Sequence, residues 1–259
     1  DTGDKVTITG ENFGTDPSDI SVSFNGTPAE FELVDESTIV ATTPADYKTG
    51  NVTVTIHGYT MTGSAMFNPN SKGDVTVLYL QNYKQPFAKA NDENWKNGEW
   101  WTPAVWNQNA ASFNAKGNTT VSGMQYKSEE GLTLAFQNGW DKEAYTNGKM
   151  WQVATLRPGK YRLEVTYAYT LVVTDAGNFI SVLIAKGDSE SDIPNVADLE
   201  QLNGVYVVYD KMGTANDSGT LVTPSFEVTE TTDVVIGFLT SLAKGNSYFK
   251  VTELKLILE

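Results

Sequence analysis

Apolar and polar residues alternate with a period of two along most of this chain, the spacing that gives a strand one inward and one outward face. Near the N-terminus the alternation occurs in four short runs, and turn formers such as Asn25-Gly26 separate them. The runs are KVTITG (5–10), ISVSFN (20–25), STIVATTP (37–44) and NVTVTIHG (51–58). Short strands at this spacing predict a small antiparallel sandwich.

A polar, turn-rich segment at residues 68–74 predicts a linker, and VTVLYL (75–80) then starts a second domain. Arg157 to Lys160 predicts a tight turn, and only residues 196–202 favour a helical turn. Eight further runs predict strands, at 131–136, 150–156, 160–173, 179–187, 204–210, 225–230, 233–240 and 248–258. Eight or more antiparallel strands on this length are typical of a jelly roll. We therefore expect domains at residues 1–70 and 74–259.

The first region resembles a known module, the IPT/TIG domain, which is immunoglobulin-like. The resemblance rests on GDKVTITGENFG (3–14), VSFNGTPAEF (22–31), STIVATTPA (37–45) and GNVTVTIHG (50–58), and extends to about Asn70. Such domains usually open with an extra strand before the glycine that corresponds to Gly3. The resemblance therefore implies that this first strand is missing here.

The second region resembles the domain-of-unknown-function 5013 family, common in Bacteroidetes surface lipoproteins and often placed after an IPT/TIG domain. The matching stretches include NYKQPF (82–87), NGEWWTPAVWNQNAA (97–111), FQNGW (136–140) and TNGKMWQVATLRPGKYRLEV (146–165). The resemblance implies a galactose-binding-like jelly roll, as in many carbohydrate-binding modules. It also implies a cell-surface location, with anchoring to the outer membrane in the full-length precursor. The family supplies no catalytic residues to transfer.

Composition narrows the classes of partner. The net charge is −14 and the chain has no cysteine, so thiol chemistry and structural disulfides are excluded. Nucleic acids and anionic membranes require clustered Lys and Arg, and no such cluster occurs in the sequence. The sequence begins at Asp1 without a signal peptide and has no run of about 20 apolar residues. We expect the chain to be the soluble part of something longer, with a neutral or cationic ligand.

The candidate binding residues gather in one short stretch. NWKNGEWWTPAVWN (94–107) holds four of the six tryptophans. Tryptophan stacks its flat face on a sugar ring, and nearby amides such as Asn94, Gln108 and Asn109 can pair with hydroxyls. Because adjacent side chains of a strand point to opposite faces, one of Trp100 and Trp101 should face outward. The predicted ligand-binding residues are Trp95, Asn97, Trp100, Trp101, Asn107 and Trp140.

The competing interpretation is that most of these tryptophans belong to the core. Trp106 lies in the apolar run TPAVW, and Trp151 alternates with Val153 in a predicted strand, so both should be buried. Trp95 is flanked by polar residues and should face outward. Trp140 follows Asn138-Gly139 on a turn and remains ambiguous. Only the outward rings are then candidates for binding.

Catalysis and metal binding have weaker sequence support. A glycosidase needs two carboxylates, and acidic residues near the tryptophans are expected by chance in so acidic a chain; they are Asp92, Glu93, Glu99, Asp141 and Glu143. Asp188, Glu190 and Asp192 alternate and could form a small calcium site, although the EF-hand pattern is absent. His57 is the only histidine and is expected at the end of an edge strand. We expect no enzyme and no required cofactor.

The sequence thus favours a non-catalytic surface protein that binds polysaccharide or a surface glycan, with the first domain as a spacer. Two alternatives remain open. One is an adhesion or assembly protein that binds a partner protein, or other cell-surface proteins, through sandwich faces or edges. The other is an accessory fragment of a glycan-degrading enzyme whose catalytic domain lies elsewhere. Adhesion predicts a large apolar patch on strands, with no shelf of exposed rings.

Overall fold

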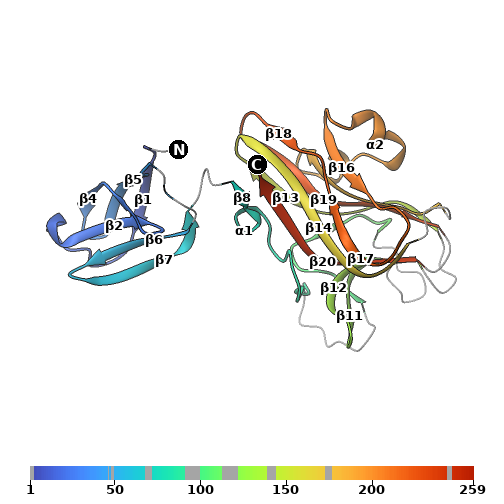
Figure 1. The fold of residues 1–259 in the computed structure, drawn as a ribbon, viewed down its shortest axis with the longest axis horizontal. Helices are drawn as coiled ribbons and strands as arrows, with labels where there is room; N and C mark the ends of the chain where they lie inside the picture. The colour runs from blue at the N-terminus through green and yellow to red at the C-terminus, as the bar shows by residue number, and fades with distance from the viewer. Residues whose placement is uncertain are drawn as a thin grey trace. The chain divides into compact units, whose positions relative to one another are not determined.

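A computed structural model describes residues 3–45, 47, 50–67, 72–90, 100–112, 122–138, 144–172, 177–243 and 247–259. The chain divides into two compact units, residues 1–72 and 73–259. Both are built almost entirely from antiparallel strands (Figure 1). Within the described ranges, no helix is both long enough and apolar enough to cross a membrane.

The first unit is a sandwich of a three-stranded and a four-stranded sheet, ordered β1-β5-β4 and β3-β2-β6-β7. A 3-10 turn, η1 (Pro17–Asp19), precedes β2. Asn25 and Gly26 both have positive φ between β2 and β3, as a tight two-residue hairpin turn requires. The strands are β1 (Lys5–Thr9), β2 (Ile20–Phe24), β3 (Thr27–Ala29), β4 (Phe31–Asp35), β5 (Thr38–Thr42), β6 (Gly50–Ile56) and β7 (Tyr59–Phe67). The predicted small sandwich is confirmed.

The second unit contains two larger sheets. A five-stranded sheet has the order β10-β13-β19-β15-β16, and an eight-stranded sheet contains β17-β14-β20-β12-β11-β9 with β18 and β8 attached. The strands of the first sheet are β10 (Asn107–Gln108), β13 (Tyr145–Leu156), β19 (Thr232–Leu242), β15 (Phe179–Lys186) and β16 (Val207–Lys211). Those of the second are β8 (Gly73–Asp74), β9 (Trp100–Trp101), β11 (Ser122–Lys127), β12 (Gly131–Asn138), β14 (Gly159–Val172), β17 (Ala215–Val222), β18 (Phe226–Val228) and β20 (Ser247–Leu258).

The connectivity of the second unit is that of a jelly roll. Along the chain, β12, β13, β14 and β15 alternate between the two sheets, and β16, β17, β19 and β20 return in the same manner. Four strands of one sheet therefore have the order β12-β20-β14-β17, and four of the other have the order β13-β19-β15-β16. This is the pattern of two interlocked Greek keys. The predicted all-β fold, with a small sandwich and then a jelly roll, is confirmed.

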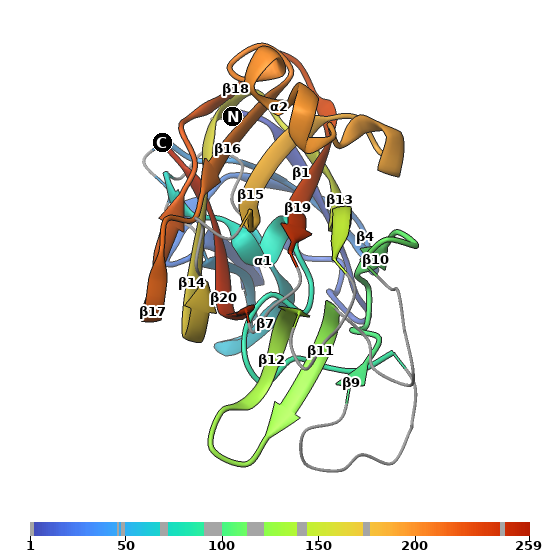
Figure 2. The same cartoon turned by 90° about the vertical axis from the view of Figure 1, so that its right-hand side faces the viewer.

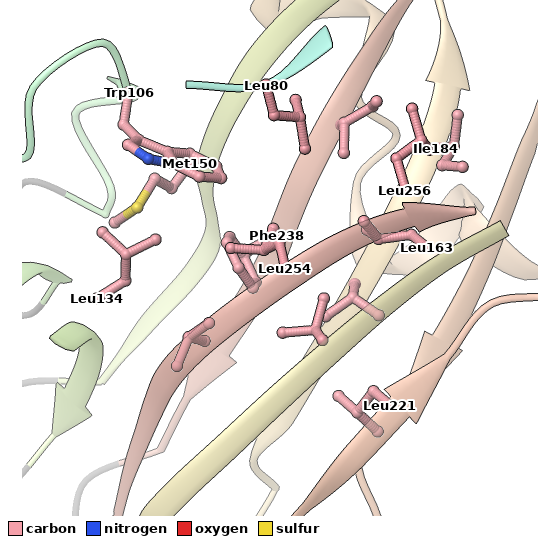
Figure 3. Close-up of a cluster of buried hydrophobic side chains, with 14 of the residues drawn as sticks. Leu80, Trp106, Leu134, Met150, Leu163, Ile184, Leu221, Phe238, Leu254 and Leu256 are labelled. Carbon is pink, nitrogen blue, oxygen red and sulfur yellow. The ribbon is translucent and has the colours of Figure 1, made fainter. Parts of the chain in front are cut away.

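The main core lies between these two sheets (Figure 3). Phe136 on β12 packs against Phe238 on β19, with ring centroids 5.0 Å apart, and so joins the two layers. A second apolar cluster covers the other face of the five-stranded sheet; α2 (Val196–Leu202) contributes Leu199 to it, and β13 contributes Trp151. Because β19 is covered on both faces, its sequence VVIGFL is apolar without alternation.

Several local predictions can be compared directly with the structure. The helix at 196–202 and the turn before β14 are confirmed. The expectation that only residues 196–202 form a helical turn is wrong, because Thr76–Tyr79 also forms a short helix, α1. The Asp74 carboxylate accepts hydrogen bonds from the backbone N–H and hydroxyl of Thr76, and this local pairing competes with an extended backbone. The predicted linker, moreover, ends in β8 rather than in a loop.

Candidate functional site

The adjacent residues Trp100 and Trp101 form β9, a two-residue strand at the edge of the eight-stranded sheet. In the β9–β11 pair, Trp101 lies opposite Met124, and Trp100 lies opposite Gln125. Trp101 and Met124 join the core, and Trp101 is only 6% exposed, whereas Trp100 is half-buried on the opposite face. Alternation thus divides the pair as predicted. Its burial removes Trp101 from the predicted binding residues, because no face of its ring is available to a sugar.

Trp106 is a core residue, as its apolar surroundings predicted. It is 5% exposed, packs on Phe238 with ring centroids 5.7 Å apart, and lies beside Met150 in Figure 3. Its indole Nε1 donates a 3.0 Å hydrogen bond to the backbone carbonyl of Asn82. The indole N–H of a buried tryptophan needs such an acceptor, and this bond also links Trp106 to the backbone at Asn82. Trp151 is likewise buried, on the α2 side of the five-stranded sheet.

The side chain of Asn82 also stabilises residues 100–106, which we call the tryptophan loop. Its amide Nδ2 donates to the carbonyl oxygens of Ala88 and Ala104, each at 3.0 Å, and its Oδ1 accepts from the Ala88 N–H at 2.7 Å. One side chain therefore ties together two chain segments that flank Trp100. Asn82 has a φ of 46°, a conformation that asparagine tolerates better than most residues.

A polar row begins at Trp100 and runs inward across the sheet. The register places Trp100 opposite Gln125 on β11, and Gln125 opposite Thr133 on β12, so all three side chains share the outward face. Figure 2 shows β9, β11 and β12 side by side at this corner. Gln125 is 4% exposed and Thr133 is 1% exposed. Among the described residues, neither Gln125 Oε1 nor Thr133 Oγ1 has a hydrogen-bond partner.

Sequence analysis missed both Gln125 and Thr133. The strand β11 was not predicted, although the run SGMQYK is followed by the turn-forming SEEG and then by the predicted strand β12. That hairpin signal was present in the sequence. The sequence does not indicate the register that brings Gln125 beside Trp100, because β9 is separated from β11 by about twenty residues.

Asn107 lies on a different surface from Trp100. It is exposed on β10, where it pairs with Trp151 and therefore shares the outward face of the five-stranded sheet. Trp100 occupies the outward face of the other sheet, so the structure does not bring these two predicted binding residues together. The remaining predicted binding residues, Trp95, Asn97 and Trp140, lie outside the described residues, as do the five candidate carboxylates.

The amide of Asn109 serves the fold rather than a ligand. Asn109 is buried, and its Oδ1 accepts from the backbone N–H groups of Ser112 and Lys149, each at 3.0 Å. Its Nδ2 donates to the Asn147 carbonyl at 2.9 Å and to Glu190 Oε1 at 3.2 Å. These bonds fasten residues 107–112 to β13. The expectation that Asn109 is free for sugar hydroxyls is therefore wrong.

A buried lysine lies in the next row of the same outward face. Lys250 on β20 is opposite Ala135 on β12, is 1% exposed, and donates from Nζ to Glu130 Oε2. The ammonium also lies 5.4 Å from the centroid of the Tyr248 ring. Burial lowers the pKa of Lys250 to about 8, although the hydrogen bond to Glu130 favours the charged form.

The acidic residues 188–192 do not form the suggested calcium site. Asp192 Oδ2 accepts from the Asp188 and Ser189 N–H groups and from the Ser189 hydroxyl, so it caps a 3-10 turn, η3 (Glu190–Asp192). The Ser189 hydroxyl bond lowers the pKa of Asp192. Tyr206 donates to the other oxygen of Asp192, and Glu190 bonds to Asn109. In the described part of the chain, no group of three or more His, Cys, Asp or Glu side chains could hold a metal.

His57 is exposed and lies in the turn between β6 and β7, immediately after the last residue of β6, and not at the end of an edge strand as predicted. Its Nδ1 is 3.5 Å from Asp19 Oδ2. With φ values of 49° and 83°, His57 and Gly58 form a tight hairpin turn, which accounts for the position of the histidine without any chemistry.

Comparisons with solved structures returned matches at low sequence identity and low structural similarity. TmCBM61 in complex with β-1,4-galactotriose shares 12% identity over 60% of this chain and 88% of that chain, with a TM-score of 0.34. The K3 cleaved adhesin domain of Lys-gingipain from Porphyromonas gingivalis shares 11% identity over 69% and 97% of the two chains, with a TM-score of 0.36. At these values, neither bears on the ligand of this chain. No curated protein matches it.

The fold and the edge tryptophan define a two-domain, all-β protein with a jelly roll as its larger part. The chain belongs to the family described as domain of unknown function (DUF5013), whose model matches residues 81–237. Residues 1–72 match the IPT/TIG domain. Both resemblances expected from the sequence are confirmed.

Proposed function

We propose that this chain is a non-catalytic cell-surface protein that binds polysaccharide or a surface glycan through the face of the jelly roll that carries Trp100. The first unit then acts as a spacer between the jelly roll and the outer membrane to which the precursor is anchored. The supporting observation is the position of Trp100, the described tryptophan that keeps exposed surface, at a sheet edge beside two polar groups that have no hydrogen-bond partner among the described residues.

The physical argument concerns what a sugar offers. One face of a pyranose carries C–H groups that pack on a flat aromatic ring, while its rim carries hydroxyls that donate and accept hydrogen bonds. Trp100 can supply the ring, and Gln125 in the opposite register position can supply an amide. Trp101, the neighbour of Trp100 on the inward face of β9, belongs to the core.

The non-catalytic part of the proposal rests on the residues available. Cysteine is absent from the sequence, and the single histidine, His57, lies in a surface turn of the first unit. A Ser-His-Asp arrangement within the jelly roll therefore lacks its base. Glycoside hydrolysis would instead require two carboxyl groups about 5 to 9.5 Å apart, on either side of the bond that is cleaved.

The test is titration calorimetry of the whole chain against a broad panel of polysaccharides, with tryptophan fluorescence in parallel. We expect at least one polymer to bind and to change the fluorescence, and Trp100→Ala to weaken that binding at least tenfold. Tyr59→Ala is the matched control, since Tyr59 is the most exposed aromatic described in the first unit, and it should leave binding unchanged. An absence of binding to every polymer would overturn the proposal.

Adhesion to a protein partner is the second candidate. Four aliphatic side chains are partly exposed, one of them in the tryptophan loop and three on segments connected to it: Val105, then Val77, Leu78 and Val153. Hydrogen bonds from Gln81 to Gln152 and from Asn82 to Ala104 connect these segments. If the glycan panel fails while Val105→Asp disrupts attachment of cells that display the protein, adhesion becomes the better description.

A further inference from the structure

We propose that the Trp100 site takes a neutral sugar unit, whose hydroxyl groups pair with Gln125 and Thr133, and that it discriminates against uronic acids and sulfated sugars. This inference depends on the proposed function, because Trp100 belongs to both. It goes further by assigning two additional binding residues and the charge class of the ligand.

The first step is the state of the two polar groups. Gln125 Oε1 and Thr133 Oγ1 are shielded from solvent, and among the described residues neither finds a hydrogen-bond partner. A buried polar atom without a partner is unfavourable, so such atoms in a native fold call for a specific explanation. A ligand that brings hydroxyl groups supplies both missing partners.

The second step is geometry. Gln125 lies directly between Trp100 and Thr133 in the register, and cross-strand neighbours have Cβ atoms about 5 Å apart. The three side chains thus form a row about 10 Å long, on one face, that starts at the sheet edge. A sugar unit stacked on Trp100 would direct the hydroxyls of its rim along this row toward Gln125.

The third step is charge. Gln125 Oε1 can only accept, so it requires a donor such as a hydroxyl, and a carboxylate or sulfate placed there would meet oxygen with oxygen. The nearest buried cation described on this face, Lys250, is already paired with Glu130. The chain as a whole carries a net charge of −14, which disfavours the approach of an acidic polymer. These three facts favour a neutral glycan.

The fourth step is access. Because both oxygens are closed to solvent, the ligand reaches them only after a local opening of this face. Strand β9 suits such an opening, since it has two residues and only two register pairs with β11. The observed association rate, followed by the change in tryptophan fluorescence, should therefore saturate at high ligand concentration.

The experiment compares Thr133→Val and Gln125→Leu with the unaltered whole chain, using neutral polymers (a galactan, a xyloglucan, a mannan) and acidic ones (polygalacturonate, hyaluronate). We expect each substitution to weaken binding of the neutral polymer about three- to tenfold. Thr133→Val should leave the melting temperature unchanged or higher, because it removes a buried hydroxyl that has no partner. Thr155→Val is the control: its hydroxyl, on β13 of the other sheet, bonds to Asp233.

The outcomes separate the two proposals. If Trp100→Ala abolishes neutral-glycan binding while Thr133→Val and Gln125→Leu do not change it, the inference fails and the proposed function stands. Binding of acidic polymers alone has the same meaning. If none of the polymers binds, both are overturned. Reduced affinity with an unchanged melting temperature supports the inference, because a purely structural role would change stability and leave affinity intact.

Discussion

Trp100 and Gln125 lie directly opposite one another in the β9–β11 pair, so their side chains share the outward face of the jelly roll. Their sequence neighbours Trp101 and Met124 share the inward face and join the core. A shift of one residue in this register would exchange the two faces and bury Trp100 in place of Trp101. The register of β9 therefore decides which tryptophan is available to a ligand.

Replacing Trp106 should affect stability far more than replacing Trp100. Trp106→Ala removes a buried ring that packs on Phe238 and donates to Asn82, and we expect a loss of about 3–5 kcal/mol in the free energy of unfolding. Trp100→Ala should lose less than half of that, because Trp100 is only half-buried. Urea denaturation of both variants measures the difference. Equal losses would contradict the assignment of Trp106 to the core and Trp100 to the surface.

Gly123 sets the close approach of β9 to β11. Its φ is 148°, and a Cβ atom added there would come within 2.7 Å of the Trp101 carbonyl oxygen. We expect Gly123→Ala to destabilise the protein by about 1–3 kcal/mol and to weaken glycan binding, because Trp100 would move with β9. Gly213→Ala is the control, since nothing lies within 4 Å of its added Cβ. If Gly123→Ala binds glycan as tightly as the unaltered chain, the position of β9 has no effect on glycan binding.

Asn82 should control the order of the tryptophan loop. Asn82→Ala removes two bonds to carbonyl oxygens and one from the Ala88 N–H. We expect a loss of about 2 kcal/mol and faster hydrogen exchange at residues 100–106. Asn107→Ala removes an exposed amide on the other sheet and should change neither exchange nor glycan affinity. A strong loss of affinity in Asn107→Ala would show that the binding surface extends across both sheets.

The buried pair of Lys250 and Glu130 should make stability depend on pH. The pKa of Lys250 is lowered by burial to about 8, below its ordinary value of 10.5. Between these values the unfolded chain binds more protons than the folded chain, so the free energy of unfolding should rise with pH. The slope for one proton is at most about 1.4 kcal/mol per pH unit.

The measurement for this prediction is a series of urea denaturations across that pH window. The double variant Lys250→Met/Glu130→Gln removes both charges without leaving either alone, and its curve should lack this rise. If the two proteins show the same dependence between pH about 8 and about 10.5, other groups are responsible.

The stability of the protein should depend on the hydrogen bonds within residues 188–192 and should not depend on a bound metal. Asp192→Ala removes an acceptor for two N–H groups and one hydroxyl, and we expect a loss of about 1–2 kcal/mol. Addition of calcium or of a chelator should leave the melting temperature of the unaltered chain unchanged, because Asp192 and Glu190 are engaged in bonds within the protein. A rise in melting temperature with calcium that Asp192→Ala abolishes would restore the calcium hypothesis.

The sequence by itself determined the fold class and the burial of Trp106 and Trp151, and its motifs carried the resemblance to the two matched domains. These depend on local information: period-two alternation, turn residues and apolar flanks specify strands and their inward faces. It also correctly divided Trp100 from Trp101, since neighbouring side chains of a strand must point to opposite faces.

Tertiary structure alone decided which residues share a surface. Alternation gives the face of each strand but not its partner, and partners such as β9, β11 and β12 are chosen by register and by packing between sheets. For this reason Asn107, only seven residues from Trp100, lies on the five-stranded sheet. Gln125 and Thr133, more distant in sequence, lie in the same row as Trp100 on the eight-stranded sheet. The candidate site is a product of strand pairing over long sequence separations, which a single sequence does not contain.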